Sequence, residues 1–124
     1  MGIIPTTPDF TDDRGTIMDL LNNVNIRHIG FISSKAGAIR GNHFHKEASQ
    51  YTYILSGKME ITSRDPGGEP ESVVISKGDL FLDPPLTEHA MRFIEDTEIL
   101  VFTTIPRDEG GYEDDTVRLE NPLI

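Results

Sequence analysis

The sequence contains no cysteine, which excludes disulfide bonds, thiolate metal ligands and a cysteine nucleophile. It also lacks an apolar run near the roughly 20 residues that a membrane-spanning helix requires. Its first residues lack the basic segment and apolar core of a signal peptide. We therefore expect a cytoplasmic protein that does not contact membranes.

Positive charge is also scarce in this chain. Eleven Lys and Arg residues stand against 21 Asp and Glu residues, so the formal net charge is -10. Such a chain repels phosphate backbones, and we do not expect it to bind nucleic acid. An anionic ligand would need arginines placed close to its own site.

The 124 residues are enough for one domain with one hydrophobic core. No long stretch has the period near 3.6 that marks an amphipathic helix, and short apolar segments alternate with Gly and Pro. This pattern predicts an all-β sandwich or barrel over residues 1–124. We expect an irregular N-terminal segment at 1–15 and an acidic tail at 106–124 that packs on the barrel or on a partner subunit. The expected strands are 26–33, 42–45, 50–55, 58–63, 72–75, 79–82, 89–93 and 98–105, with a short strand or helical turn at 16–21.

Two histidines one residue apart form the most informative feature. On a strand, residues i and i+2 point to the same face, so His43 and His45 can aim at one point. Gln50 joins them only if the chain turns through 46–49, and His89 must come from another strand. Three imidazoles and an amide oxygen suit a divalent transition metal such as Fe, Mn, Ni or Zn. Gln50 would leave the charge of that metal uncompensated, and we expect no organic cofactor.

The spacing of these residues resembles the two motifs of the cupin superfamily. In the first motif, G-(x)5-H-x-H-(x)4-E-(x)6-G, a glutamine replaces the usual glutamate. In the second, G-(x)5-P-x-G-(x)2-H-(x)3-N, leucine and phenylalanine replace the second glycine and the asparagine. The matching residues are Gly37, His43, His45, Gly57, Gly78, Pro84 and His89, and the substituted positions are Gln50, Leu86 and Phe93. The resemblance implies a single-domain β-jelly-roll barrel, or double-stranded β-helix, with the histidines inside.

Two shorter segments are similar to sequences in bacterial sugar-nucleotide cupins. These are Asp13-Arg14-Gly15 and the run from Arg40 to Gln50, which is similar to the R-G-x-H-x-H-K…Q run of dTDP-4-keto-6-deoxyhexose 3,4-ketoisomerases. The dTDP-rhamnose 3,5-epimerases have a related architecture. This resemblance implies an isomerase or epimerase of polysaccharide biosynthesis that acts on a nucleotide-linked keto sugar, with the two histidines as proton-transfer groups and no obligatory metal.

The two arginines of these segments are candidate ligands of the substrate diphosphate, because guanidinium binds phosphate in a bidentate manner. Each also has a structural interpretation. Arg40 can pair with a surface carboxylate, and Arg14 can brace its turn against Asp12 or Asp13.

Two other functions remain open from the sequence. A metal-dependent cupin, such as an oxygenase on a small molecule, would use His43, His45, Gln50 and His89 as ligands. A non-enzymatic sugar or metabolite sensor would bind without turnover. We favour an enzyme, and a homodimer in which Tyr51 and Tyr53 serve as packing or dimer contacts. Asp83 and Glu88 are expected to be solvated.

Overall fold

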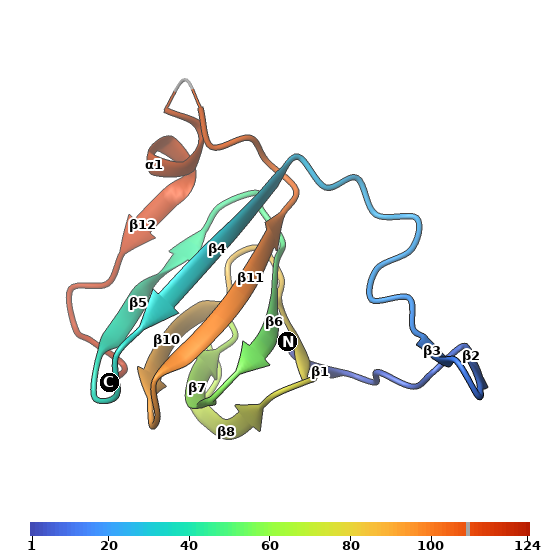
Figure 1. Ribbon diagram of the computed structural model, residues 1–124. Helices are drawn as coiled ribbons and strands as arrows, with labels where there is room; N and C mark the ends of the chain where they lie inside the picture. Colours follow the sequence, from blue (N-terminus) through green and yellow to red (C-terminus); the bar gives the residue numbers. More distant parts are fainter. Residues whose placement is uncertain (109) are drawn as a thin grey trace.

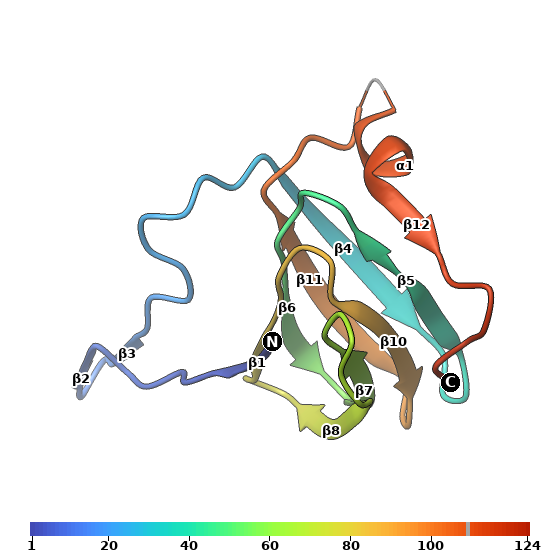
Figure 2. The same cartoon turned by 180° about the vertical axis from the view of Figure 1, so that it is seen from behind.

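The computed structural model describes residues 1–108 and 110–124, which form an antiparallel barrel of two five-stranded sheets (Figures 1 and 2). The first sheet has the order β1 (Gly2–Ile4), β9 (Leu80–Asp83), β6 (Gln50–Ser56), β11 (Thr97–Thr103), β4 (His28–Ser34). The second has the order β12 (Thr116–Arg118), β5 (Ile39–His45), β10 (Glu88–Phe93), β7 (Lys58–Arg64), β8 (Glu71–Ser76). The predicted all-β jelly-roll fold is confirmed. No helix in the described ranges is long and apolar enough to cross a membrane.

The inside of the barrel is apolar at one end and polar at the other. Along β10 the inward side chains are His89, then Met91 and Phe93, and along β6 they change from Gln50 to Ile54. The apolar end is the hydrophobic core, where both sheets contribute. Its buried members are Ile54, Met59, Ile61, Ile75, Phe81, Met91, Phe93, Ile99 and Val101. The opposite end therefore collects buried polar groups, which is the condition for a site inside the barrel.

The prediction that Asp83 is solvated is wrong, because its side chain is only 3% exposed. It is the last residue of β9 and pairs with Gln50 in the neighbouring strand. Strand alternation places it on the same inward face as Phe81. Glu88 is half-buried and forms an ion pair with Arg64 on β7.

The two ends of the chain are placed differently relative to the barrel. The N-terminal segment leaves the barrel after β1 and forms a hairpin of β2 (Phe10–Asp12) and β3 (Gly15–Ile17) that lies away from both sheets (Figures 1 and 2). The C-terminal tail, apart from residue 109, which lies outside the described residues, packs on its own barrel. It contains a short helix, α1 (Gly111–Asp115), followed by β12, which pairs with β5. The Asn42 side chain accepts the N–H groups of Leu123 and Ile124 at 2.7 and 3.3 Å.

Candidate functional site

Three histidines converge at the polar end of the barrel. His43, His45 and His89 are 6%, 2% and 1% exposed, and one ring nitrogen of each lies within 4.8 Å of the others. His43 and His45 share the inward face of β5, as the spacing of two residues requires. His89 stands opposite His43 in the register between β10 and β5.

Gln50 reaches this cluster from the other sheet. Residues 46–49 carry the chain from β5 in the second sheet to β6 in the first, so that Gln50 faces His45 across the barrel. Gln50 Oε1 lies 3.1 Å from His45 Nε2. The structure therefore brings together all four residues that the sequence suggested as metal ligands.

A bulge in β5 directs Arg40 toward the same cavity as His43. The two residues are three positions apart, so a regular strand would point them to opposite faces. The register between β10 and β5 shifts at this point, and Gly41 and Asn42 both have positive φ, at 89° and 56°. A Cβ on residue 41 would lie 3.0 Å from the His89 carbonyl oxygen, so glycine is required there.

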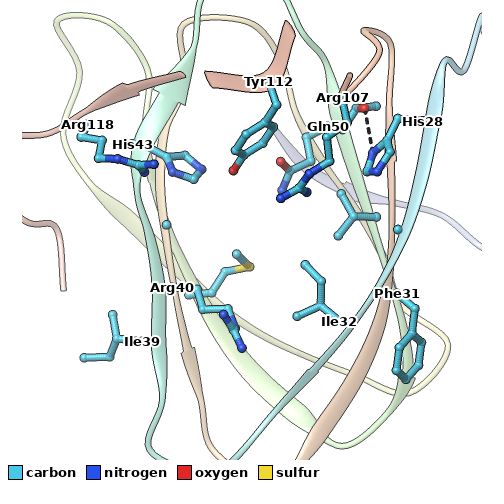
Figure 3. A pocket seen from close by; sticks show the side chains of 15 residues that line it. His28, Phe31, Ile32, Ile39, Arg40, His43, Gln50, Arg107, Tyr112 and Arg118 are labelled. Carbon is cyan, nitrogen blue, oxygen red and sulfur yellow. Dashed lines mark hydrogen bonds between the residues drawn. The ribbon is translucent and has the colours of Figure 1, made fainter. Parts of the chain in front are cut away.

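A cavity of about 380 Å³ opens beside the histidines (Figure 3). It is lined from β4, β5, β6, β10, β11 and the tail, and His43, Gln50 and Arg40 are on its wall. Arg40 donates to Ser34 Oγ at 2.8 Å from this position. Arg14 is not part of the cavity of its own chain. It lies in the outlying hairpin, where it is bound to Asp12 and its side chain is 83% exposed.

The surroundings of the three histidine rings lower their pKa values and so favour the neutral imidazole. Burial, followed by the nearby His89, His45 and Arg118, lowers the pKa of His43 to about 3. Burial and then His45 lower the pKa of His89 to about 4. Burial also lowers the pKa of His45, although Gln50, Asp115 and Asp83 oppose this shift. Neutral imidazoles have a lone pair that can bind a metal or accept a proton.

A buried carboxyl group lies behind the cluster. Asp83 Oδ2 is 3.9 Å from His89 Nδ1, and Ser63 Oγ donates to Asp83 Oδ1 at 3.2 Å. Burial raises the pKa of Asp83 to about 7, although the Ser63 hydrogen bond and His45 act in the opposite direction. His89 Nδ1 lies 3.2 Å from the Thr87 carbonyl oxygen, which can only accept. The proton of a neutral His89 is therefore on Nδ1.

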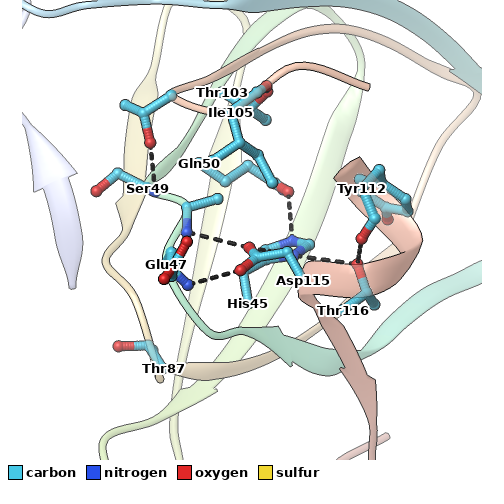
Figure 4. A network of polar contacts seen from close by, with 12 residues as sticks. His45, Glu47, Ser49, Gln50, Thr87, Thr103, Ile105, Tyr112, Asp115 and Thr116 are labelled. Atoms are coloured by element: carbon cyan, nitrogen blue, oxygen red, sulfur yellow. Dashed lines mark hydrogen bonds and ion pairs between the residues drawn. The ribbon is translucent and has the colours of Figure 1, made fainter. Parts of the chain in front are cut away.

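Sequence reasoning missed the residues that the tail and its preceding loop bring to the site. Tyr112, Arg107 and Arg118 line the cavity, with the Arg107 guanidinium 4.7 Å from the centre of the Tyr112 ring. Thr116 and Asp115 contact His45 from behind (Figure 4). In the sequence, these residues are marked only by their place in the acidic C-terminal tail. Their approach to the site depends on the pairing of β12 with β5, which joins residues some 70 positions apart. His28, the first residue of β4, also lines the cavity.

The donor set fits a divalent metal ion. Among the described residues, His43 Nδ1 and His89 Nε2 are buried ring nitrogens without a hydrogen-bond partner. On a neutral His89 this Nε2 has a free lone pair, because its proton is on Nδ1. His43, His45 and His89 would hold the ion, with the Gln50 amide oxygen as a fourth donor. Such an ion would supply Lewis acidity toward a bound oxygen.

Comparison with known proteins agrees with this architecture. The family profile described as "Cupin domain" matches residues 30–106. The oxalate decarboxylase OxdC of Bacillus subtilis is 30% identical over 102 residues, which are 81% of this chain and 23% of that relative. The chain thus spans about a quarter of the length of this curated protein.

Solved structures extend the likeness over nearly the whole chain. The TDP-quinovose 3,4-ketoisomerase WlaRB from Campylobacter jejuni superposes with a TM-score of 0.78 at 22% identity, covering 94% of this chain and 90% of that one. The sugar 3,4-ketoisomerase QdtA from Thermoanaerobacterium thermosaccharolyticum, in complex with TDP, has a TM-score of 0.77 at 20% identity, covering 95% and 87%. At these identities the likeness establishes the fold. Together with the family match over most of the barrel, it shows that the chain belongs to the cupin family.

Proposed function

We propose that the chain is an isomerase that moves the keto group of a nucleotide-linked hexose, in the manner of a 3,4-ketoisomerase. The observation that carries this proposal is the placement of neutral His43 on the wall of a cavity that arginines also line. The cavity volume of about 380 Å³ lies within the range of small-molecule sites. The similar structures include a ketoisomerase in complex with TDP and one in complex with TDP-4-keto-6-deoxyglucose.

The reaction needs one proton to leave carbon and one to return. His43 removes the proton from C3, next to the C4 carbonyl, and an enediolate forms. The C3 hydroxyl proton passes to the former carbonyl oxygen, and a proton returned to C4 completes the 3-keto product, so no oxidant or reductant is consumed. Tyr112, which also lines the cavity, is the candidate for returning the proton, and its ring centre is 6.5 Å from that of His43. His45, whose ring centre is 4.9 Å from that of His43, is the other candidate.

Local arginines would hold the diphosphate of the substrate on this otherwise acidic protein. Arg40, Arg107 and Arg118 line the cavity from three different segments. A bound diphosphate would also raise the pKa of His43, because a nearby anion favours the charged imidazolium, and so make it a better base. Arg14 could join this group only from another subunit, because it is remote from the cavity of its own chain.

Incubation of the purified protein with dTDP-4-keto-6-deoxyglucose tests the proposed function. We expect the 3-keto isomer to form, with one deuterium entering the sugar at the receiving carbon when the solvent is D₂O. NMR spectra of the sugar ring follow both changes. Binding of the nucleotide sugar without deuterium uptake or isomer would instead indicate a metabolite-binding module.

A metal-dependent cupin enzyme, such as an oxygenase, is the second candidate function. It is favoured by the three converging ring nitrogens and by the unpartnered lone pair of His89. Elemental analysis of protein purified without added metal separates the two candidates. One equivalent of Fe, Mn, Ni or Zn that is lost in the His89→Asn variant would support the metal site. Turnover of the keto sugar that is unchanged after chelation would show that isomerisation does not depend on a metal.

We also propose that two copies of the chain associate through the outer face of the first sheet. The strand register aligns apolar side chains in two rows across this face. None of these side chains is buried within a single chain. They are Ile29, Phe102, Tyr51 and Leu82 in the first row, and Phe31, Leu100 and Tyr53 in the second. Such a continuous apolar face is typical of a subunit interface.

A charge on this face is therefore expected to convert a dimer into a monomer. Ile29 is 61% exposed in the first sheet, and Val74 is 50% exposed on β8 of the second. Ile29→Glu should halve the mass measured by light scattering, whereas Val74→Glu should leave it at the dimer value. A monomeric wild type, or equal effects of the two substitutions, would contradict this interface.

A further inference from the structure

The ring of His45 is contacted on both nitrogens, by different parts of the chain (Figure 4). Nε2 faces Gln50 on β6. Nδ1 faces the junction of α1 and β12, where Thr116 Oγ1 lies at 3.3 Å and Asp115 Oδ2 at 4.0 Å. The ring is 2% exposed, so water has little access to either nitrogen. These contacts decide which nitrogen of a neutral His45 carries the proton.

Thr116 can only accept a hydrogen bond from His45. Its hydroxyl has one proton, and that proton is donated to the Tyr112 carbonyl oxygen at 2.5 Å. A carbonyl oxygen has no proton to give in return. The contact between Thr116 Oγ1 and His45 Nδ1 is therefore a hydrogen bond only if Nδ1 is the donor.

Asp115 also favours a proton on His45 Nδ1. Its two carboxylate oxygens accept the backbone N–H groups of Glu47 and Ala48 at 2.8 and 3.1 Å, which fixes the group as an acceptor. The carboxylate thus places negative charge beside Nδ1, where an N–H group is favoured over a lone pair. The same two bonds hold the turn that follows His45, so the tail and the site are tied together.

We propose that Thr116 and Asp115 are positioning residues that hold His45 in the tautomer with the proton on Nδ1 and the lone pair on Nε2. The lone pair is then presented on the side of Gln50, where it can bind a metal or receive a proton. His89 has the same arrangement, since its Nδ1 donates to the Thr87 carbonyl oxygen. The assignment of the tautomer does not depend on the proposed function, whereas the catalytic role of this lone pair rests on it.

The arrangement assigns the orientation of the Gln50 amide as well. An unprotonated Nε2 cannot donate to Oε1, which lies 3.1 Å away. When His45 is neutral and no metal ion is bound, the amide must therefore rotate by half a turn and donate from its nitrogen to Nε2. Gln50 fits both states of His45, because its amide can either donate or accept. A glutamate, which is usual at this position in the cupin motif, would only accept when ionised.

Nitrogen NMR of the histidine rings tests the inference without reference to activity. The protein is labelled with ¹⁵N-histidine, treated with a chelator and studied above pH 6.5, where His45, with its lowered pKa, is neutral. A His45→Gln variant assigns its signals. We expect a protonated Nδ1 and an unprotonated Nε2 in the wild type. A wild-type His45 with its proton on Nε2 would overturn the proposal.

Two variants of Thr116 separate positioning from simple packing. Thr116→Val keeps the shape but removes the hydroxyl that accepts from Nδ1. The share of His45 with its proton on Nε2, where Gln50 Oε1 can accept it, should therefore rise against the remaining effect of Asp115. Turnover of the keto sugar should fall about 10- to 100-fold, as for other groups that orient a histidine. Thr116→Ser keeps the hydroxyl and should preserve both the wild-type tautomer and turnover within about threefold.

The outcomes distinguish this inference from the proposed function. An unchanged tautomer population in Thr116→Val contradicts the positioning role of Thr116, whatever the activity. If the tautomers are as expected but the protein does not convert the keto sugar, the inference about His45 holds and the proposed isomerase function is rejected. If Thr116→Val fails to fold, Asp115→Asn replaces it, and a larger share of His45 with its proton on Nε2 is then the expected result. A wild-type His45 with its proton on Nε2 still overturns the inference by itself.

Discussion

Replacement of His43 by asparagine is expected to lower isomerase turnover by about 10²- to 10⁴-fold, the usual contribution of a general base. Asparagine is smaller than histidine and polar, but it cannot take a proton from carbon. His43 is the histidine of the cluster that reaches the cavity wall, so substrate can contact it directly. The loss should appear in kcat, because a group that acts on the transferred proton contributes little to ground-state binding.

Deuterium uptake from D₂O into the sugar measures this effect at the reacting carbon itself. Phe44→Leu is the matched control, because Phe44 is the next residue on β5 and its side chain points away from the histidines. It should exchange at close to the wild-type rate. Wild-type exchange in the His43→Asn variant would remove His43 from the reaction.

The part of the site that depends on local geometry could be predicted from the sequence. Strand alternation places His43 and His45 on one face without any knowledge of the fold. His89 was expected to come from another strand and also matched the second cupin motif, and the register between β10 and β5 places it opposite His43. Gln50 was expected to require a turn, and residues 46–49 make it.

The remaining part depends on irregular or distant pairing. Alternation alone would have pointed Arg40 away from His43, and only the bulge at Gly41 and Asn42 corrects its direction. Asp115 and Thr116 reach His45 because β12 is added to the edge of β5, which no short-range pattern encodes. In a sequence, a carboxylate that follows an apolar strand indicates the start of a loop, which is why Asp83 was expected to be solvated. In the structure, Asp83 is still part of β9 and faces inward.

The polar end of the barrel also affects the stability of the fold. The folded protein keeps His43 and His89 neutral down to pKa values of about 3 and 4, whereas unfolded histidine titrates near 6.5. Below pH 6.5 the unfolded chain therefore binds protons that the folded chain does not, and acid lowers the free energy of unfolding. Asp83 acts oppositely, because its pKa is about 7 in the folded state and 3.8 in the unfolded state. Acid thus protonates the folded carboxyl first and stabilises the fold.

The contributions of His43 and His89 against that of Asp83 leave a net loss on the order of 2–3 kcal/mol in the free energy of unfolding between pH 6.5 and 4, since one pKa unit corresponds to about 1.4 kcal/mol. The lowered pKa of His45 acts in the same direction as those of the other two histidines. Asp83→Asn removes the opposing contribution, and the loss over the same interval should grow to roughly 5 kcal/mol. Urea unfolding at a series of pH values measures both slopes. Asp13→Asn, in the exposed turn of the hairpin, is the matched control and should follow the wild-type profile. Parallel profiles for the wild type and Asp83→Asn would mean that Asp83 is ionised inside the folded barrel.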